Sequence, residues 1–163
     1  MNEPLAFDPL VALRALKKAR VNFVVIGGVA ARLHGSPSLT RDLDICHDRD
    51  LINLERLSKV LNDLHAHLRG VDEVVPFILD QRTLLAGGSF TFVTDAGDLD
   101  LLAVPAGVSG FDGLLKGAEE IDLGEFKIKV ASLDDLIRMK QAAGRPKDLI
   151  EVEILSALRD EQQ

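Results

Sequence analysis

The stretch that decides the fold reads FVVIGGVAARLHG over residues 23–35 and LTRDLDI over residues 39–45. An apolar run ends in a glycine pair, a short segment of helical spacing follows, and a second apolar run carries two aspartates. This order predicts a buried strand, a tight turn, a short helix and a second strand. Because successive strand side chains point to opposite faces, we expect Asp42 and Asp44 to project from the same face.

The two aspartates and the glycine pair predict neighbouring sites for a cation and for phosphate. Like charges in one small volume raise each other's pKa unless a cation neutralises them, and carboxylate oxygens suit Mg²⁺. Gly27 and Gly28 let the backbone approach a ligand just before a helix N-terminus, whose free N–H groups favour phosphate. The sequence therefore places a metal beside a phosphate group.

Simpler interpretations of each piece stay open. An Asp-x-Asp pair also occurs in turns and on solvent-facing strands, and a glycine pair can be no more than a tight turn between a strand and a helix. No Gly-x-Gly-x-x-Gly or Walker pattern follows the glycines, which argues against dinucleotide-binding and P-loop proteins. The phosphate interpretation thus depends on the carboxylates.

The combination resembles the nucleotidyltransferase superfamily typified by DNA polymerase β. The signature of that superfamily is an apolar residue, Gly-Gly or Gly-Ser, a spacer, and Asp-apolar-Asp/Glu-apolar. It stands here as Ile26-Gly27-Gly28, thirteen intervening residues, and Asp42-Leu43-Asp44-Ile45. The chain is similar in particular to a minimal bacterial branch that includes the AbiEii-type proteins of abortive-infection and toxin–antitoxin systems. The segments that carry this likeness are GVAARLHG (28–35), TRDLD (40–44), GDLDLL (97–102) and LIRMKQAAGRPKD (136–148).

The resemblance implies a metal site with a third carboxylate from a strand next to the one that bears Asp42 and Asp44. Asp98 and Asp100 share one face of a predicted strand, but Asp98 borders the turn whereas Asp100 sits deeper in the strand. We therefore select Asp100. By resemblance, Asp42 and Asp44 hold Mg²⁺ or Mn²⁺, while Asp100 holds the catalytic metal and draws the proton from the attacking hydroxyl.

The resemblance also implies a set of nucleotide-binding residues. Lys140 matches a family lysine that faces the triphosphate; a lysine suits phosphate, yet many helical lysines only solvate a surface, so both interpretations stay open. The expected nucleotide contacts are Gly27, Gly28, Thr40, Lys140, Arg145 and Lys147.

One departure from the branch concerns the segment before the aspartates. Members often carry an arginine shortly before the Thr-x-Asp-x-Asp segment, whereas residues 37–39 are Pro-Ser-Leu here. Arg41 follows Thr40, and strand alternation predicts that it points to the face opposite Thr40. We therefore expect a changed arrangement of the phosphate contacts.

Composition narrows the class of protein. The 163 residues suit a single domain, and 19 Lys and Arg against 26 Asp and Glu give a net charge of −7, which argues against extensive contact with nucleic acid. We therefore rank a small-molecule or protein acceptor above RNA. The single Cys46 cannot form an internal disulfide, and no apolar run has the length of a membrane span or the pattern of a signal peptide. A cytoplasmic protein is expected.

Further elements follow from capping signals and periodicity. Asp8 and Pro9 open a helix that ends near Lys17-Lys18, and leucines at helical spacing predict a helix over residues 50–68. Segment 70–88, interrupted by Pro76, stays undecided between strand and helix. The remaining predictions are strands over 22–26, 89–94, 98–104 and 125–130, a turn at 95–97, a helix from a capping box at Ser132 to Ala143, and a last helix after residues 144–146.

These observations predict one α/β (α+β) domain over residues 1–163, a small mixed sheet flanked by helices. The expected activity is Mg²⁺-dependent transfer of a nucleoside monophosphate from an NTP to a hydroxyl acceptor. Two alternatives remain: a non-catalytic nucleotide- or partner-binding member of the same fold, such as half of a toxin–antitoxin-like pair, and a protein-interaction module. The short C-terminal part implies that the acceptor is small or that a partner protein supplies a surface for it.

Overall fold

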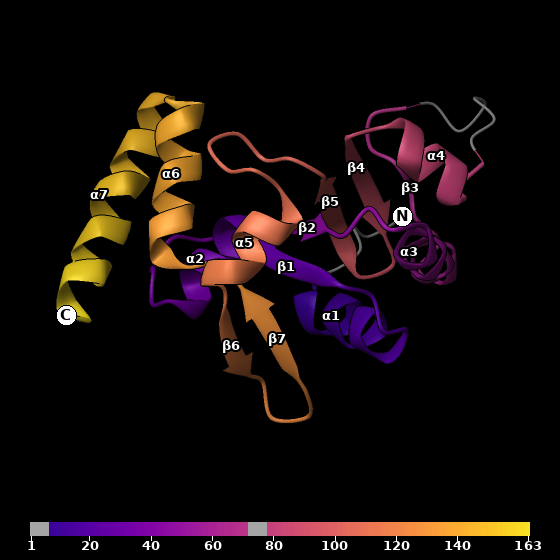
Figure 1. Cartoon of the computed structure of the whole chain (residues 1–163), viewed down its shortest axis with the longest axis horizontal. Helices are drawn as coiled ribbons and strands as arrows, with labels where there is room; N and C mark the ends of the chain where they lie inside the picture. Colours follow the sequence, from indigo (N-terminus) through magenta and orange to yellow (C-terminus); the bar gives the residue numbers. More distant parts are fainter. Residues whose placement is uncertain (1–6, 72–77) are drawn as a thin grey trace, which may run out of the picture.

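The computed structural model describes residues 7–71 and 78–163. Within these residues, seven strands form one mixed sheet in the order β3-β4-β5-β2-β1-β7-β6, with helices around it (Figure 1). The strands are β1 (Phe23–Ile26), β2 (Asp42–His47), β3 (His67–Leu68), β4 (Ser89–Thr94), β5 (Gly97–Leu102), β6 (Glu119–Asp122) and β7 (Lys127–Val130). The helices are α1 (Pro9–Lys18), α2 (Gly27–Leu33), α3 (Leu51–Asp63), α4 (Gln81–Ala86), α5 (Phe111–Gly117), α6 (Leu133–Ala143) and α7 (Pro146–Glu161).

Strand β1 lies inside the sheet, between antiparallel β2 and parallel β7. All four of its residues are buried, which explains the uninterrupted apolar run FVVI, because a strand covered on both faces has no solvent-facing side. Its last residue, Ile26, pairs with Asp44 of β2. The glycine pair that follows β1 therefore starts beside the aspartates.

Strands β2 and β5 set the register of the acidic residues. They run parallel, with Asp42 opposite Asp98 and Asp44 opposite Asp100. The predicted hairpin of β4 and β5 is confirmed, and the Thr94 hydroxyl closes its turn by donating to the Gly97 carbonyl at 2.7 Å. Gly97 has φ +98°, a conformation that favours glycine. Strand β5 ends at Leu102, two residues before the predicted end.

The helix predicted over residues 50–68 is shorter than expected. Asp50 caps α3 by accepting from the Ile52 N–H at 2.9 Å, and α3 ends at Asp63. His65 then adopts φ +53°, and residues 67–68 pair with β4 as β3. Periodicity misassigned Leu68 to the helix because a two-residue edge strand has too few positions to display its own period.

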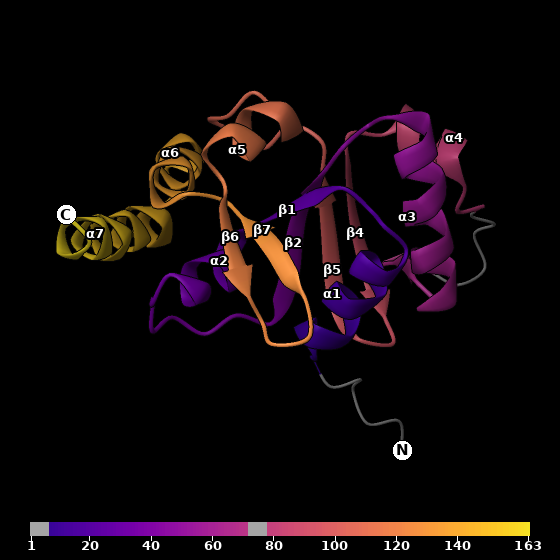
Figure 2. The same ribbon diagram turned by 60° about the horizontal axis from the view of Figure 1, so that its bottom comes forward.

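Helices α1 and α3 contact each other, while α6 and α7 pack together at the other end of the sheet (Figure 2). The predicted caps of α1 and α6 are confirmed: Asp8 accepts from Leu10 and Ser132 accepts from Asp135. Helix α2 packs on β1 and β2 and also contacts α6. This arrangement sets the α6–α7 pair beside the edge where β1 ends and β2 begins.

Besides β3, three elements escaped the sequence analysis. Helix α5 and strand β6 lie between β5 and β7 and were not predicted, and α4 occupies part of the undecided segment 70–88. Pro76 lies outside the described residues. No described helix has both the length and the apolarity that a membrane crossing requires. Among residues 7–71 and 78–163, the buried apolar side chains form one cluster that includes residues of β1, β2, β5, α1 and α3.

Candidate active site

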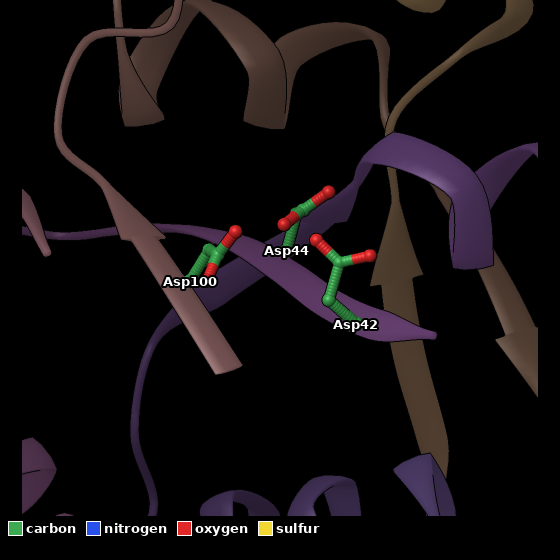
Figure 3. A group of neighbouring side chains, drawn as sticks. All are labelled: Asp42, Asp44 and Asp100. Carbon is green, nitrogen blue, oxygen red and sulfur yellow. The ribbon is translucent and has the colours of Figure 1, made fainter. Parts of the chain in front are cut away.

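Three aspartate side chains converge where β2 and β5 lie side by side. Each of Asp42, Asp44 and Asp100 offers a carboxylate oxygen, and these oxygens all lie within 4.8 Å of one another (Figure 3). Strand alternation brings Asp42 and Asp44 to one face, and the parallel register places Asp100 directly opposite Asp44. The structure thus brings together the three carboxylates selected from the sequence, with Asp100 rather than Asp98 in the group.

The carboxylates repel one another in a partly buried place. Burial and then the negative charges of Asp42 and Asp100 raise the pKa of Asp44 from 3.8 to about 8. Burial also raises the pKa of Asp100, while the guanidinium of Arg69 works in the opposite direction. Because the carboxylates repel one another, binding of a cation between them is favoured.

The glycine pair leaves room for two of these side chains. Gly27 has φ +68°, and a Cβ there would overlap the Asp44 carboxylate. A Cβ on Gly28 would come within 2.7 Å of the Cβ and Oγ1 of Thr40. Any larger residue at either position would displace Asp44 or Thr40, so the glycines are required by the site as well as by the turn.

Thr40 and Arg41 lie in the loop just before β2. The Thr40 hydroxyl donates to the Asp42 carbonyl at 3.1 Å, which fixes the start of the strand. Both residues line one cleft, and the direction expected for the Arg41 side chain stays a prediction. Strand alternation does not apply to them because β2 begins only at Asp42.

The aspartates form one wall of a cleft of about 700 Å³. Basic residues of α6, the α6–α7 junction and α7 line it as well, together with apolar residues such as Leu136 and Met139. Every residue selected from the sequence lines this cleft: Gly27, Gly28, Thr40, Asp42, Asp44, Asp100, Lys140, Arg145 and Lys147.

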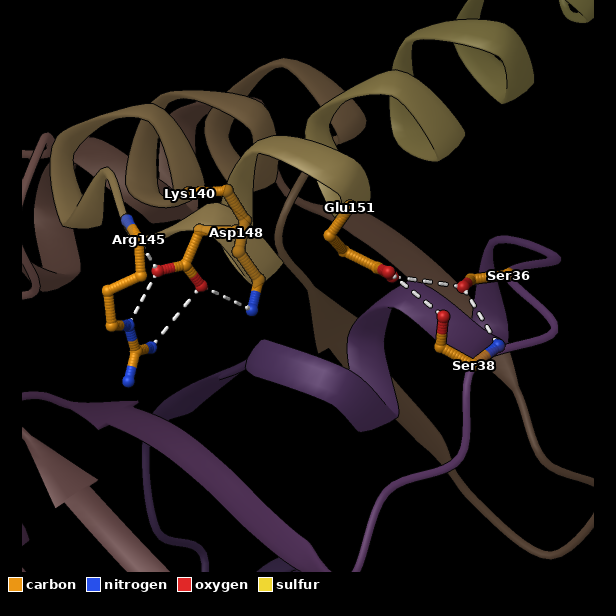
Figure 4. A network of polar contacts seen from close by, with 6 residues as sticks. All are labelled: Ser36, Ser38, Lys140, Arg145, Asp148 and Glu151. Carbon is orange, nitrogen blue, oxygen red and sulfur yellow. Dashed lines mark hydrogen bonds and ion pairs between the residues drawn. The ribbon is translucent and has the colours of Figure 1, made fainter.

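A buried carboxylate holds two of the basic side chains (Figure 4). Arg145 donates to Asp148 from its backbone N–H at 3.2 Å and from Nε at 2.6 Å. Lys140 Nζ lies 3.5 Å from the same carboxylate. The hydrogen bond from Arg145 is the main cause that lowers the pKa of Asp148 to about 2. The sequence analysis assigned Asp148 no contact of its own, although its spacing of three from Arg145 on a helix was a usable signal.

Helix α7 also holds the loop that leads to β2. Glu151 accepts hydrogen bonds from the Ser36 hydroxyl at 3.1 Å and the Ser38 hydroxyl at 2.9 Å (Figure 4). Arg32 of α2 donates to the Ser38 carbonyl at 3.0 Å. These contacts tie the loop that carries Thr40 and the helices that carry the basic residues into one frame.

Arg69 is a neighbour of the acidic group that sequence reasoning missed. Its Nη2 donates to Asp100 Oδ1 at 2.7 Å, and its Nε lies 3.3 Å from Asp98 Oδ2. No local motif marks Arg69, because it lies 31 positions before Asp100 in the chain and meets it only across the sheet.

Comparison with solved structures identifies the fold. The lincosamide adenylyltransferase LnuA, solved with lincomycin, is similar to the chain with a TM-score of 0.60 and 16% identity over 92% of this chain and 95% of that chain. The chain has the nucleotidyltransferase fold. ANT(2'')-Ia, solved with adenylyl-2''-tobramycin, shares the nucleotidyltransferase fold with a TM-score of 0.54, 16% identity and coverage of 95% and 98%. A putative nucleotidyltransferase from Thermotoga maritima is similar to the chain with a TM-score of 0.50 and 19% identity over 96% of this chain and 94% of that chain.

No protein-family model and no curated protein sequence matches the chain. The nucleotidyltransferase fold is therefore shown by the arrangement of the elements, at 16–19% identity to the similar structures. The expectation of a mixed sheet flanked by helices with this fold is confirmed.

Proposed function

We propose that the protein is a nucleotidyltransferase that moves a nucleoside monophosphate from an NTP to a hydroxyl group of a small-molecule acceptor, with Mg²⁺ or Mn²⁺ as cofactor. One observation carries the proposal: three convergent carboxylates and a set of basic side chains line one cleft. The nucleotidyltransferase fold, shared along nearly the whole chain with two antibiotic-modifying proteins, supports it.

The donor set fits a hard divalent cation. Asp42, Asp44 and Asp100 supply only oxygen atoms, gathered within 4.8 Å, and a divalent ion relieves the repulsion that raises the pKa of Asp44. When bound there, the ion would neutralise phosphate charge and activate the acceptor oxygen. Asp42 and Asp44 would hold it from β2, and Asp100 from β5.

The other wall of the cleft suits the phosphates of the donor. Lys140, Arg145 and Lys147 line it, while Arg41 lines the cleft from the loop before β2 and has no ion-pair partner within the described part of the chain. Gly27 and Gly28 also line the cleft, and Thr40 offers a hydroxyl there. A triphosphate lying between the two walls would meet positive charge on one side and the acidic group on the other.

Asp100 is the group that we assign to the acceptor. Its side chain is 16% exposed and lines the cleft from β5, the strand beside the one that carries Asp42 and Asp44. A hydroxyl that approaches over β5 would pass its proton to the Asp100 carboxylate as its oxygen attacks the α-phosphorus and pyrophosphate leaves.

A small acceptor agrees with the size of the chain and with its comparisons. LnuA was solved with lincomycin and ANT(2'')-Ia with adenylyl-2''-tobramycin, and the chain covers 95% and 98% of those proteins. The net charge of −7 disfavours RNA. We place the activity in a single cytoplasmic domain. Membership of the AbiEii-type branch, with a partner protein, is the second candidate, and it rests on the motifs at residues 28–44 and 136–148.

The test is transfer of label from NTPs carrying ³²P in the α-phosphate to a panel of hydroxylated small molecules, proteins and RNA in the presence of Mg²⁺. Asp100→Asn should retain Mg–NTP binding but reduce turnover by about 100-fold or more, the usual scale for loss of a general base. Lys140→Ala should instead weaken NTP affinity. Tight Mg–NTP binding by the wild-type protein without transfer to any acceptor, alone or with its genomic neighbour, would replace the enzyme with the non-catalytic, partner-binding alternative.

A further inference from the structure

Arg69 reaches the acidic group along a row of side chains that crosses the sheet. Its backbone N–H donates to the Thr91 carbonyl at 2.9 Å, Thr91 pairs with Asp100, and Asp100 pairs with Asp44. Residues opposite each other on neighbouring strands point to the same face. Thr91, Asp100 and Asp44 therefore share one face of the sheet on β4, β5 and β2, and Arg69, which directly follows β3, is aligned with Thr91.

The long side chain of Arg69 spans two strands to reach Asp100. Neighbouring strands lie about 5 Å apart, so β3 and β5 are separated by about 10 Å. Thr91, which stands between them, has a short side chain that does not block this path. On the way the guanidinium also donates to the Phe92 carbonyl at 3.0 Å, which anchors it on β4.

Arg69 supplies the positive charge of the acidic group. Within residues 7–71 and 78–163, it is the one basic side chain within ion-pair distance of Asp42, Asp44, Asp98 or Asp100. The Arg69 side chain is one-third exposed, against 16% for the side chain of Asp100. The pair is therefore sheltered enough to fix geometry, because a planar guanidinium holds a carboxylate in a defined orientation.

We propose that Arg69 is a positioning residue of the site: it holds the Asp100 carboxylate in the orientation in which that carboxylate joins Asp42 and Asp44 around a divalent cation. The bond from Arg69 engages Asp100 Oδ1, and the Asp100 carboxylate also offers an oxygen to the group of three aspartates. This inference rests on the proposed function. It extends that function to a residue on the edge of the sheet that no sequence motif marks.

The first arm of the test is metal binding without nucleotide. Arg69→Ala should weaken Mn²⁺ affinity, measured by calorimetric titration, by roughly ten-fold or more, the scale found for residues that orient metal ligands. Arg69→Lys keeps the charge but loses the planar guanidinium, so its Mn²⁺ affinity should fall between those of the wild type and Arg69→Ala. Arg14→Met is the matched control, since it breaks an exposed arginine–carboxylate pair, to Glu125 on the β6–β7 connection, outside the cleft.

The second arm is turnover. Arg69→Ala should lower kcat by roughly ten-fold or more while the KM for NTP changes little, because Arg69 contacts no residue of the phosphate wall. Added guanidinium ion should restore part of the activity of Arg69→Ala but not of Asp100→Asn. Circular dichroism checks that the variants are folded, and if Arg69→Ala is not, Arg69→Lys carries the test.

The outcomes separate the two proposals. A folded Arg69→Ala or Arg69→Lys with wild-type Mn²⁺ affinity overturns the positioning role and leaves Arg69 as a structural tie between β3, β4 and β5. A wild-type protein that binds Mn²⁺ but transfers no nucleotide overturns the proposed function alone, because the first arm still reports on Arg69. A wild-type protein that binds no Mn²⁺ overturns both.

Discussion

At the scale of single residues, the site combines groups that would destabilise an ordinary domain. Asp44 lies partly buried beside Asp42 and Asp100, Gly27 has a left-handed conformation, and the Asp44 carboxylate occupies the space that a Cβ at residue 27 would need. Such local costs are typical of functional sites, where binding rather than stability determines which residue is present.

Asp44→Asn should therefore stabilise the metal-free protein at neutral and higher pH. The pKa of Asp44 is about 8 in the folded protein and 3.8 in its ordinary range. The contribution of Asp44 to the free energy of unfolding is therefore most favourable below pH 4 and is lost as the pH rises toward 8. The variant carries no charge at this position. If the lost repulsion adds about 1 kcal/mol to the free energy of unfolding, the melting temperature of the variant should exceed that of the wild type by roughly 3 °C or more at pH 8. The measurement is a thermal melt in a chelator at pH 4 and pH 8.

The difference in melting temperature between Asp44→Asn and the wild type should nearly vanish at pH 4. At pH 8, Mg²⁺ should narrow this difference, because it stabilises only the wild type. A variant that melts lower than the wild type at both pH values would show that Asp44 is held by favourable contacts rather than under repulsion.

At the scale of elements, the α6–α7 pair presents basic side chains to the cleft. The αL residue Gly144, with φ +66°, ends α6, and Arg145 begins the turn into α7. The pair is joined through Asp148, whose buried carboxylate accepts from Arg145 and lies near Lys140. The buried carboxylate of Asp148 thus holds two of the basic side chains, Arg145 and Lys140, that we assign to the phosphates of the NTP.

Asp148→Asn should leave the side chains of Lys140 and Arg145 less firmly held. Without the charge, Lys140 and Arg145 lose their common anchor, and the KM for NTP should rise by about tenfold, the scale of one charge-assisted hydrogen bond, with a smaller effect on kcat. Steady-state kinetics across NTP concentrations measure the split. Tighter NTP binding in the variant would instead mean that Asp148 only offsets the positive charge.

Asp148 also predicts a sensitivity to acid. Its folded pKa of about 2 lies below the ordinary value, so its stabilising effect is present above pH 4 and is lost as the pH falls from about 4 toward 2. Wild-type protein should lose stability faster than Asp148→Asn over this range in denaturant titrations at successive pH values. Parallel losses in the two proteins would assign the acid sensitivity to other carboxylates.

At the scale of the whole molecule, the cleft brings the sheet and the α6–α7 pair together, and a ligand that touches both should stabilise the fold. Mg²⁺ or Mn²⁺ with NTP binds only the folded protein and should raise the melting temperature; a ligand at 100 times its Kd adds about 2.7 kcal/mol. The shift should vanish in Asp42→Asn/Asp44→Asn, which removes charge at nearly constant volume. A metal-dependent shift that persists in this double variant would locate the binding elsewhere.

The sequence by itself determined the features that depend on neighbours in the chain. The apolar run of β1, the glycine pair, the common face of Asp42 and Asp44 and the caps Asp8 and Ser132 all follow from local periodicity and turn chemistry. The hairpin of β4 and β5 follows from its turn for the same reason.

Tertiary structure decided what depends on pairing at long range. The parallel register of β2 and β5, which sets Asp100 rather than Asp98 opposite Asp44, comes from the packing of both strands in the core. The entry of Lys140 into the cleft and the contact of Arg69 with Asp100 follow from how α6 and β3 pack. A strand period specifies a face but not a partner, because the partner is selected by the sum of many distant contacts that no single segment encodes.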